Sequence, residues 1–190
     1  MRPRIENWTT DAEAAELARL AAGKMVLEVG AYRGFGTVLM AQAGATVWAV
    51  DWHRGDSGGD PALGAQDTLC AWWTNVRRHH VEDQVVGLVG RSRQVLAGLD
   101  GRWFDMAFID ADHAYESVQD DAVAALPLLR PGGLLVFHDY CPVWPGVVRA
   151  VDEFVEMLLR GGELGRQNGR KLRLVGSLAV VQLKDSLRDS

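Results

Sequence analysis

The stretch VLEVGAYRGFGT, residues 26–37, joins an apolar run to a cluster of glycines. Gly30, Gly34 and Gly36 are grouped directly after the run. Glycine accepts positive φ angles and lets other groups approach the backbone closely, so this grouping favours a tight turn. The residues after the turn suit a helix. The stretch therefore predicts a buried strand that turns sharply into a helix, which is the opening unit of an α/β fold.

The rest of the chain repeats this alternation of short apolar runs and helical patterns. Such alternation is typical of a mostly parallel sheet with helices on both faces. The tail KLRLVGSLAVVQL, residues 171–183, reads as two strands joined at Gly176 and Ser177, which predicts an antiparallel hairpin at the sheet edge. We expect one domain over residues 1–190, with a Rossmann-like, doubly wound α/β sheet of seven strands. The other predicted strands are residues 25–29, 46–50, 85–89, 106–109 and 134–137.

Local signals mark the helices and one long loop. Thr10 and Glu13 have the spacing of a capping box, and Ser92 is expected to cap the fourth helix. Pro127 should kink or separate the last turn of the fifth helix. The loop at residues 53–67 is rich in Gly, Pro and Asp, which predicts a lid or a binding segment.

Composition limits the classes of partner. The formal net charge is −5, which argues against general binding to nucleic acid or to anionic membranes. No apolar run is long enough to span a bilayer, and the start resembles no signal peptide, so we expect a cytoplasmic protein.

Cys70 and Cys141 lack metal-site spacing and fit a reducing compartment. The seven tryptophans suggest a homodimer.

Acids and histidines follow two of the predicted strands. FIDADHAY, residues 108–115, ends a buried run with Asp110, Asp112 and His113, and His138 and Asp139 end the next. The carboxyl ends of neighbouring parallel strands meet at one sheet edge, where α/β folds bind ligands. Each residue alone could cap a helix or be a satisfied buried group. Together they predict a reactive cluster that works by a general base or by a divalent cation.

An acid also ends the second predicted strand. Asp51 in WAVDWH lies about twenty residues after the glycine turn, where nucleoside-binding α/β folds place a carboxylate for the ribose hydroxyls. The glycine spacing is GxxxGxG with Glu28 before it, which disfavours NAD. This combination resembles motif I of class I S-adenosylmethionine-dependent methyltransferases. Nearly the whole chain is similar to their small O-methyltransferase branch, which includes the catechol, caffeoyl-CoA, macrolide-sugar and cephamycin-pathway enzymes.

The resemblance implies a set of cofactor contacts. Glu28, Gly30 and Ala31 would line the methionine portion of S-adenosylmethionine, and Asp51 would hold its ribose. Trp52 would flank the adenine, although a plain core tryptophan is an equal alternative. The remaining cofactor-binding residues that the resemblance implies are Tyr32, Gly34, Gly90, Arg91, Ser92 and Asp110.

The resemblance also implies a metal site. In metal-dependent members, an acid at the position of Asp110 and a pair of residues at the positions of His138 and Asp139 hold Mg²⁺. A basic residue at the position of His113 lies near the substrate hydroxyl. This chain departs from the pattern because His138 stands where those relatives have an acid. Imidazole binds Mg²⁺ poorly and Mn²⁺, Fe²⁺ or Zn²⁺ well. Without a metal, His113 or His138 could act as base with an aspartate such as Asp112 to orient it.

The expected function is O-methylation of a small hydroxylated molecule, a sugar or a phenolic natural product, with S-adenosylmethionine and a divalent metal (Mg or Mn). The alternatives are an NAD-dependent oxidoreductase on a similar sheet and a non-catalytic cofactor-binding protein. The reactive cluster disfavours the last alternative. Nucleic-acid methylation is disfavoured because the chain has neither an NPPY-like motif nor an excess of basic residues.

Overall fold

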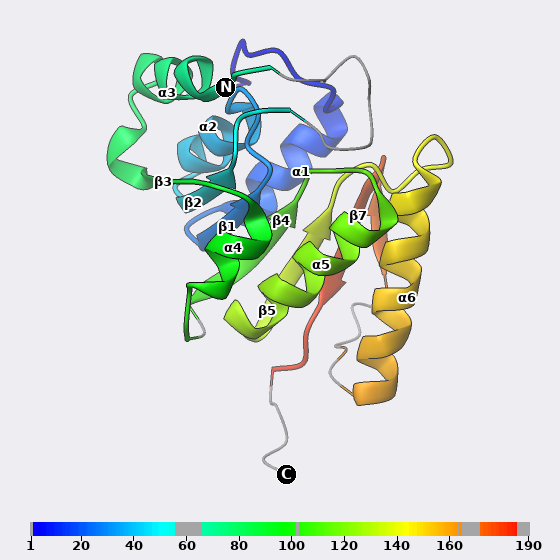
Figure 1. The fold of residues 1–190 in the computed structure, drawn as a ribbon. Helices are drawn as coiled ribbons and strands as arrows, with labels where there is room; N and C mark the ends of the chain where they lie inside the picture. Colours follow the sequence, from blue (N-terminus) through cyan, green and yellow to red (C-terminus); the bar gives the residue numbers. More distant parts are fainter. Residues whose placement is uncertain (1, 56–65, 102, 163, 165–171, 186–190) are drawn as a thin grey trace.

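The computed structural model describes residues 2–55, 66–101, 103–162, 164 and 172–185. Within these residues seven strands form one sheet in the order β3-β2-β1-β4-β5-β7-β6 (Figure 1). Strands β1 to β5 are parallel, and β7 is antiparallel to both β5 and β6. The predicted Rossmann-like α/β sheet with an antiparallel C-terminal hairpin is confirmed. The strands are β1 (Met25–Val29), β2 (Thr46–Asp51), β3 (Val85–Val89), β4 (Phe104–Ile109), β5 (Leu129–Phe137), β6 (Arg173–Val175) and β7 (Leu178–Gln182).

The helices begin and end close to the predicted signals. Thr10 and Glu13 form the capping box of α1. Pro127 lies in a separate 3-10 turn, η3, after α5. The prediction for Ser92 is wrong: Arg91 is the N-cap of α4, no side chain caps that helix, and Ser92 is its first residue. The helices are α1 (Asp11–Ala21), α2 (Phe35–Gln42), α3 (Leu69–Arg78), η2 (Glu82–Gln84), α4 (Ser92–Ala97), α5 (Tyr115–Ala125), η3 (Leu126–Leu128) and α6 (Pro145–Gly161).

Helices cover the sheet on both faces, and alternate residues of β1, β2, β4 and β5 enter two different cores. In β1, Val26 belongs to the core under α1, α2 and α3, and Leu27 to the core under α4, α5 and α6. Burial on both faces explains why these four strands are continuous apolar runs, whereas β3 lies at the sheet edge and has no buried residue. None of the helices in the described ranges has the length and apolar character needed to cross a membrane.

The chain reverses its winding direction between β1 and β4. After β1 it builds β2 and β3 on one side, and α4 then carries it back to β4 on the other side. Gly30 follows β1 with φ of 91°, and a Cβ atom there would lie 2.2 Å from the carbonyl oxygen of Asp110. Gly30 is thus required for the close approach of the two strand ends. In sheets of this kind, ligands bind in the crevice outside such a reversal.

Candidate active site

A cavity of about 490 Å³ lies over this reversal. Its volume is in the range of pockets that hold small ligands. All residues predicted to bind the cofactor or a metal or to act in catalysis line this cavity, except Gly34. Gly34 is the N-cap of α2, with φ of 90°. The structure therefore brings the others to one place, although their individual roles stay predictions. The predicted residues that line the cavity are Glu28, Gly30, Ala31, Tyr32, Asp51, Trp52, Gly90, Arg91, Ser92, Asp110, Asp112, His113, His138 and Asp139.

Asp51 organises the glycine turn. Its Oδ2 accepts hydrogen bonds from the backbone amides of Ala31 and Tyr32 at 2.8 and 2.7 Å, and its Oδ1 accepts one from the amide of His53 at 2.7 Å. Tyr32 and His53 both have positive φ angles, of 46° and 57°. The carboxylate thus stabilises two unusual backbone conformations beside the cavity. Sequence reasoning assigned Asp51 to the ribose alone and missed this second task.

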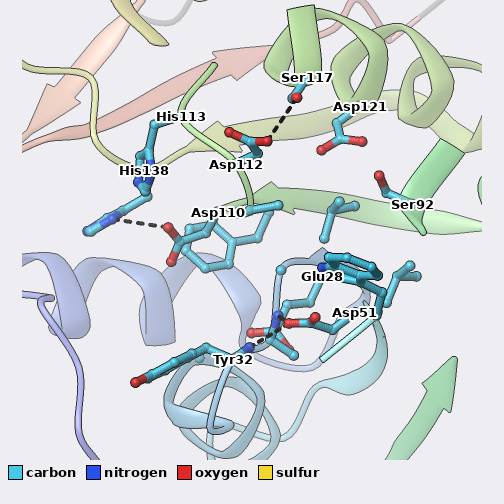
Figure 2. A pocket seen from close by; sticks show the side chains of 18 of the residues that line it. Glu28, Tyr32, Asp51, Ser92, Asp110, Asp112, His113, Ser117, Asp121 and His138 are labelled. Atoms are coloured by element: carbon cyan, nitrogen blue, oxygen red, sulfur yellow. Dashed lines mark hydrogen bonds and ion pairs between the residues drawn. The ribbon is translucent and has the colours of Figure 1, made fainter. Parts of the chain in front are cut away.

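Glu28 is a buried acid in the floor of the cavity (Figure 2). It accepts a hydrogen bond from the hydroxyl of Thr37, whose oxygen in turn accepts one from Nε1 of Trp72 at 3.1 Å. Burial raises the pKa of the Glu28 carboxyl to about 8, against the lowering effect of Thr37. At neutral pH this side chain is therefore uncharged. A Cβ atom at Gly36 would lie 2.4 Å from Oε1 of Glu28, so the third glycine makes room for this acid.

Trp52 is not a plain core tryptophan. It lines the cavity, and the guanidinium carbon of Arg91 lies 4.0 Å from its ring centroid. Cation–π contacts of this kind hold an aromatic ring in a defined plane. The backbone amide of Gly90 donates to the carbonyl of Asp51 at 2.9 Å, which holds the end of β3 against the end of β2. The predicted adenine-side residues thus form one connected wall.

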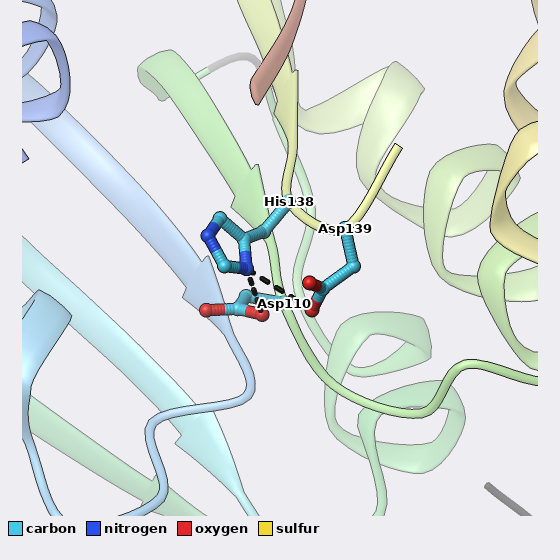
Figure 3. A group of neighbouring side chains, drawn as sticks. All are labelled: Asp110, His138 and Asp139. Carbon is cyan, nitrogen blue, oxygen red and sulfur yellow. Dashed lines mark hydrogen bonds and ion pairs between the residues drawn. The ribbon is translucent and has the colours of Figure 1, made fainter. Parts of the chain in front are cut away.

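The second group of predicted residues meets at the ends of β4 and β5. Nδ1 of His138 lies 3.0 Å from Oδ2 of Asp139 and 3.3 Å from Oδ1 of Asp110 (Figure 3). Nε2 of His113 also lies 3.0 Å from Oδ2 of Asp139. The ring of His113 stacks on Trp144 at a centroid distance of 4.0 Å. We call Asp110, His113, His138 and Asp139 the His–Asp cluster.

The charges in the His–Asp cluster shift the pKa values of its members. Burial lowers the pKa of His138, but the charges and hydrogen bonds of Asp110 and Asp139 outweigh it and raise that pKa to about 11. Burial also acts on Asp139, yet hydrogen bonds from His113 and His138 hold the pKa of its carboxyl well below the ordinary value. Asp139 has φ of 58°, a left-handed conformation that its contacts with two imidazoles stabilise.

Asp112 lines the cavity but contacts the start of α5. Its Oδ1 accepts a hydrogen bond from the amide of Ala114 at 2.9 Å, and its Oδ2 accepts one from the hydroxyl of Ser117 at 3.1 Å. Figure 2 shows its carboxylate turned toward Ser117. The aspartate that contacts both histidines is Asp139. These hydrogen bonds of Asp112 order the start of α5, and a role in orienting a catalytic histidine stays a prediction.

Sequence reasoning did not name several individual residues in or beside the cavity. Residues 6–9 of the N-terminal segment line the cavity, and Trp8 packs on Tyr32 at a centroid distance of 5.4 Å. Glu13 of the capping box does not itself line the cavity, but its Oε2 lies 3.8 Å from Nε2 of His138. Asp121 of α5 is buried in the opposite wall. The capping-box pattern identified Glu13 only as a helix signal, and no local pattern marks Asp121. The predicted binding loop falls mainly on residues 56–65, outside the described residues.

The donor set of the His–Asp cluster fits a divalent cation. One ligand atom each from Asp110, His138 and Asp139 lies within 4.8 Å of the others. Nε2 of His138 has no hydrogen-bond partner within the described residues. Two carboxylates with one imidazole suit Mn²⁺, Fe²⁺ or Zn²⁺ better than Mg²⁺.

The sheet order, the glycine turn and the acid after β2 together define a Rossmann-like protein with a nucleoside-type crevice. A sequence model described as a methyltransferase domain matches residues 27–140. The chain belongs to this methyltransferase domain family, and the class I methyltransferase resemblance is confirmed. A comparison with curated protein sequences finds no match.

Solved structures share the fold over most of the chain. The O-methyltransferase TomG from Streptomyces achromogenes, in complex with SAM, is 20% identical over 93% of this chain and 82% of that one, with a TM-score of 0.68. The O-methyltransferase NovP is 20% identical over 90% and 79%, with a TM-score of 0.72. The O-methyltransferase from Bacillus cereus, in complex with SAH, is 18% identical over 95% and 84%, with a TM-score of 0.69. At these identities the likeness shows a common fold.

Proposed function

We propose that the chain is an S-adenosylmethionine-dependent O-methyltransferase that acts on a small hydroxylated molecule, a sugar or a phenolic natural product. The observation that carries the proposal is the single cavity that joins the glycine turn and Asp51 to the His–Asp cluster. One wall suits the cofactor, and the other holds imidazoles and acids that can activate a hydroxyl. The O-methyltransferase neighbours support the choice of oxygen as acceptor.

Charge and hydrogen bonding favour a sulfonium cofactor over NAD. The amides of Ala31 and Tyr32, which a pyrophosphate would need at this turn, are already bound by the carboxylate of Asp51. Even without Glu28, which is uncharged at neutral pH, acids outnumber arginines in the cavity wall, which suits a cation and repels a dianionic pyrophosphate. The acids that line the cavity are Glu6, Glu28, Asp51, Asp110, Asp112, Asp120, Asp121 and Asp139.

In the proposed reaction His113 takes the proton of the acceptor hydroxyl. The oxygen forms a bond to the cofactor methyl carbon, the carbon–sulfur bond breaks, and the sulfur keeps the electron pair. Asp139 positions His113 and stabilises the imidazolium that forms. His138 suits this role less, because its raised pKa keeps a proton on the ring at neutral pH. Trp144 fixes the plane of the His113 ring by stacking.

A divalent cation is the second part of the proposal. Asp110, His138 and Asp139 would hold it, and its binding would displace a proton from the ring of His138. When bound, such an ion lowers the pKa of a coordinated hydroxyl and so makes it a better nucleophile. Asp139 contacts His113 as well, so it connects the ion ligands to the proposed base.

Calorimetry with S-adenosylmethionine, S-adenosylhomocysteine and NAD tests the cofactor assignment. We expect the two sulfur nucleosides to bind and NAD not to bind. Release of S-adenosylhomocysteine in the presence of a panel of phenols and sugars then tests the transfer. Binding of NAD in place of the sulfur nucleosides would exclude the proposal. Binding of S-adenosylmethionine with no transfer to any acceptor would favour a non-catalytic protein.

A further inference from the structure

Asp121 is a buried acid of the cavity that the proposed reaction does not use. It lies on α5, is 4% exposed, and lines the cavity. Its carboxyl accepts a hydrogen bond from the side chain of Ser92 at the start of α4. Figure 2 shows Asp121 and Ser92 together on the side of the cavity away from His113 and His138.

This carboxyl has no cationic partner in the part of the chain that the structure describes. The neighbouring guanidinium of Arg93 lies 3.3 Å from Oδ2 of Asp120 instead. Burial raises the pKa of Asp121 to about 6, against the hydrogen bond from Ser92, and Asp120 and Asp112 add like charge. Burying an acid beside a cavity costs folding free energy unless hydrogen-bond donors reach the carboxylate. One hydrogen bond from Ser92 leaves the carboxylate with acceptor capacity for a ligand.

The position of Asp121 identifies the part of the ligand that could supply those donors. Asp51 ends β2 and pairs in register with Val89 of β3, so a nucleoside whose ribose lies at Asp51 has its base beside the start of α4. The ring of Trp52, held by Arg91, provides a flat surface at this end. Ser92 and Asp121 provide polar groups beside it. A planar base with an exocyclic amino group matches this combination of ring face and carboxylate.

We propose that Asp121, oriented by Ser92, accepts a hydrogen bond from the exocyclic amino group of the cofactor adenine and selects it against bases that carry an oxygen there. The proposal rests on the proposed function, since it assumes a nucleoside cofactor. Adenine presents N–H donors at this position, whereas hypoxanthine presents a carbonyl oxygen, which would face an ionised carboxylate and lose the bond. Asp121 is thus a specificity-determining residue.

The alternative is that Asp121 only joins α5 to α4 through Ser92. A structural link would change the affinity for both bases to the same extent, or would change stability alone. Selection of the amino group changes the ratio of the two affinities. The ratio therefore separates the two roles.

The experiment is calorimetry at about pH 8, where the carboxyl is ionised, with S-adenosylhomocysteine and its hypoxanthine counterpart S-inosylhomocysteine. The wild-type chain should bind the adenine ligand about 10- to 100-fold more tightly. Asp121→Asn should reduce this ratio to about threefold or less, and Ser92→Ala should reduce it in part. Glu116→Gln, an exposed change on the same helix, should keep the wild-type ratio.

Equal wild-type affinities for the two ligands would overturn the proposal without any variant. It would also be overturned if folded Asp121→Asn kept the full ratio, or weakened both ligands equally. Should Asp121→Asn fail to fold, the wild-type and Ser92→Ala ratios still decide. Failure of the wild-type chain to bind either sulfur nucleoside would reject the proposed function, and this inference with it. Binding of the adenine ligand without selection would reject the inference alone.

Discussion

The imidazoles of His113 and His138 contact the same atom, Oδ2 of Asp139, each at 3.0 Å. His113 follows β4 and His138 follows β5, so the two rings converge only because these strands are neighbours. One carboxylate therefore influences the charge of both histidines. The first two predictions depend on this arrangement.

Asp139→Asn should lower the pKa of His138 from about 11 toward the ordinary value of 6.5. The cause is the loss of a negative charge 3.0 Å from Nδ1 of His138. NMR titration of the imidazole nitrogens measures this without any substrate. The matched change Asp152→Asn, on the exposed side of α6, should leave the titration of His138 unchanged. If His138 of the wild-type chain lost its proton near pH 6.5, this would contradict the arrangement.

Mn²⁺ should bind the wild-type chain, and Asp110→Ala should weaken its binding by about tenfold or more, because one of three ligand atoms is lost. Electron paramagnetic resonance of Mn²⁺ measures this independently of turnover. Chelation should also suppress methyl transfer, and Mn²⁺ should restore it better than Mg²⁺ because His138 supplies nitrogen. Full activity after thorough chelation would remove the ion from the proposed reaction.

Gly30→Ala should destabilise the chain by about 3 kcal/mol or more and abolish binding of S-adenosylhomocysteine. The new Cβ would lie 2.2 Å from the carbonyl oxygen of Asp110, so the ends of β1 and β4 would have to separate. Gly23→Ala is the matched control, because Gly23 also has positive φ but a methyl group added there would meet nothing within 4 Å. Gly23→Ala should cost only about 1 kcal/mol in denaturant unfolding. Equal losses in the two variants would show that backbone strain alone is responsible.

Glu13→Gln should destabilise the chain by about 1–3 kcal/mol at neutral pH. Glu13 is buried, and hydrogen bonds from Ser177 and Thr10 overcome the effect of burial and lower the pKa of its carboxyl to about 2. A lowered pKa stabilises the fold above the ordinary value of 4.5, and the stabilisation is lost as the pH falls from 4.5 toward 2. Thermal melts of both chains should therefore converge over this range. A difference that stayed constant on acidification would contradict the assigned charge.

Glu28→Gln should have the opposite dependence on pH. Because burial raises the pKa of Glu28 to about 8, the folded wild-type chain holds a proton that the unfolded chain loses above 4.5. The unfolding free energy contributed by this group therefore falls as the pH rises from 4.5 to 8, by at most about 1.4 kcal/mol per pH unit. The amide cannot ionise, so the variant should gain stability relative to wild type across this window. Parallel melting curves for the two chains from pH 5 to 8 would show that Glu28 is ionised in the fold.

Local patterns in the sequence predicted the elements and the His–Asp cluster, whereas most cofactor-side residues of the candidate site were predicted from the family resemblance. Continuous apolar runs predicted the parallel strands, because burial of β1, β2, β4 and β5 on both faces leaves no polar alternation. The predicted bounds were short for β2 by one residue, for β4, which begins at Phe104, and for β5, which begins at Leu129. In β5, Pro131 and the two glycines after it weaken the strand signal. The glycine cluster marked the turn that needs positive φ, and the residues at the strand ends marked the His–Asp cluster.

Only the tertiary structure decided which polar groups meet. Glu13 accepts hydrogen bonds from Ser177, which is 164 positions away, and lies near His138. Asp121 meets Ser92 because α4 and α5 pack on the same face of the sheet. Hydrophobic periodicity tells which face of an element is buried, but it carries no information on the partner across that face. That partner depends on strand order and on the crossover helices, which are properties of the assembled sheet.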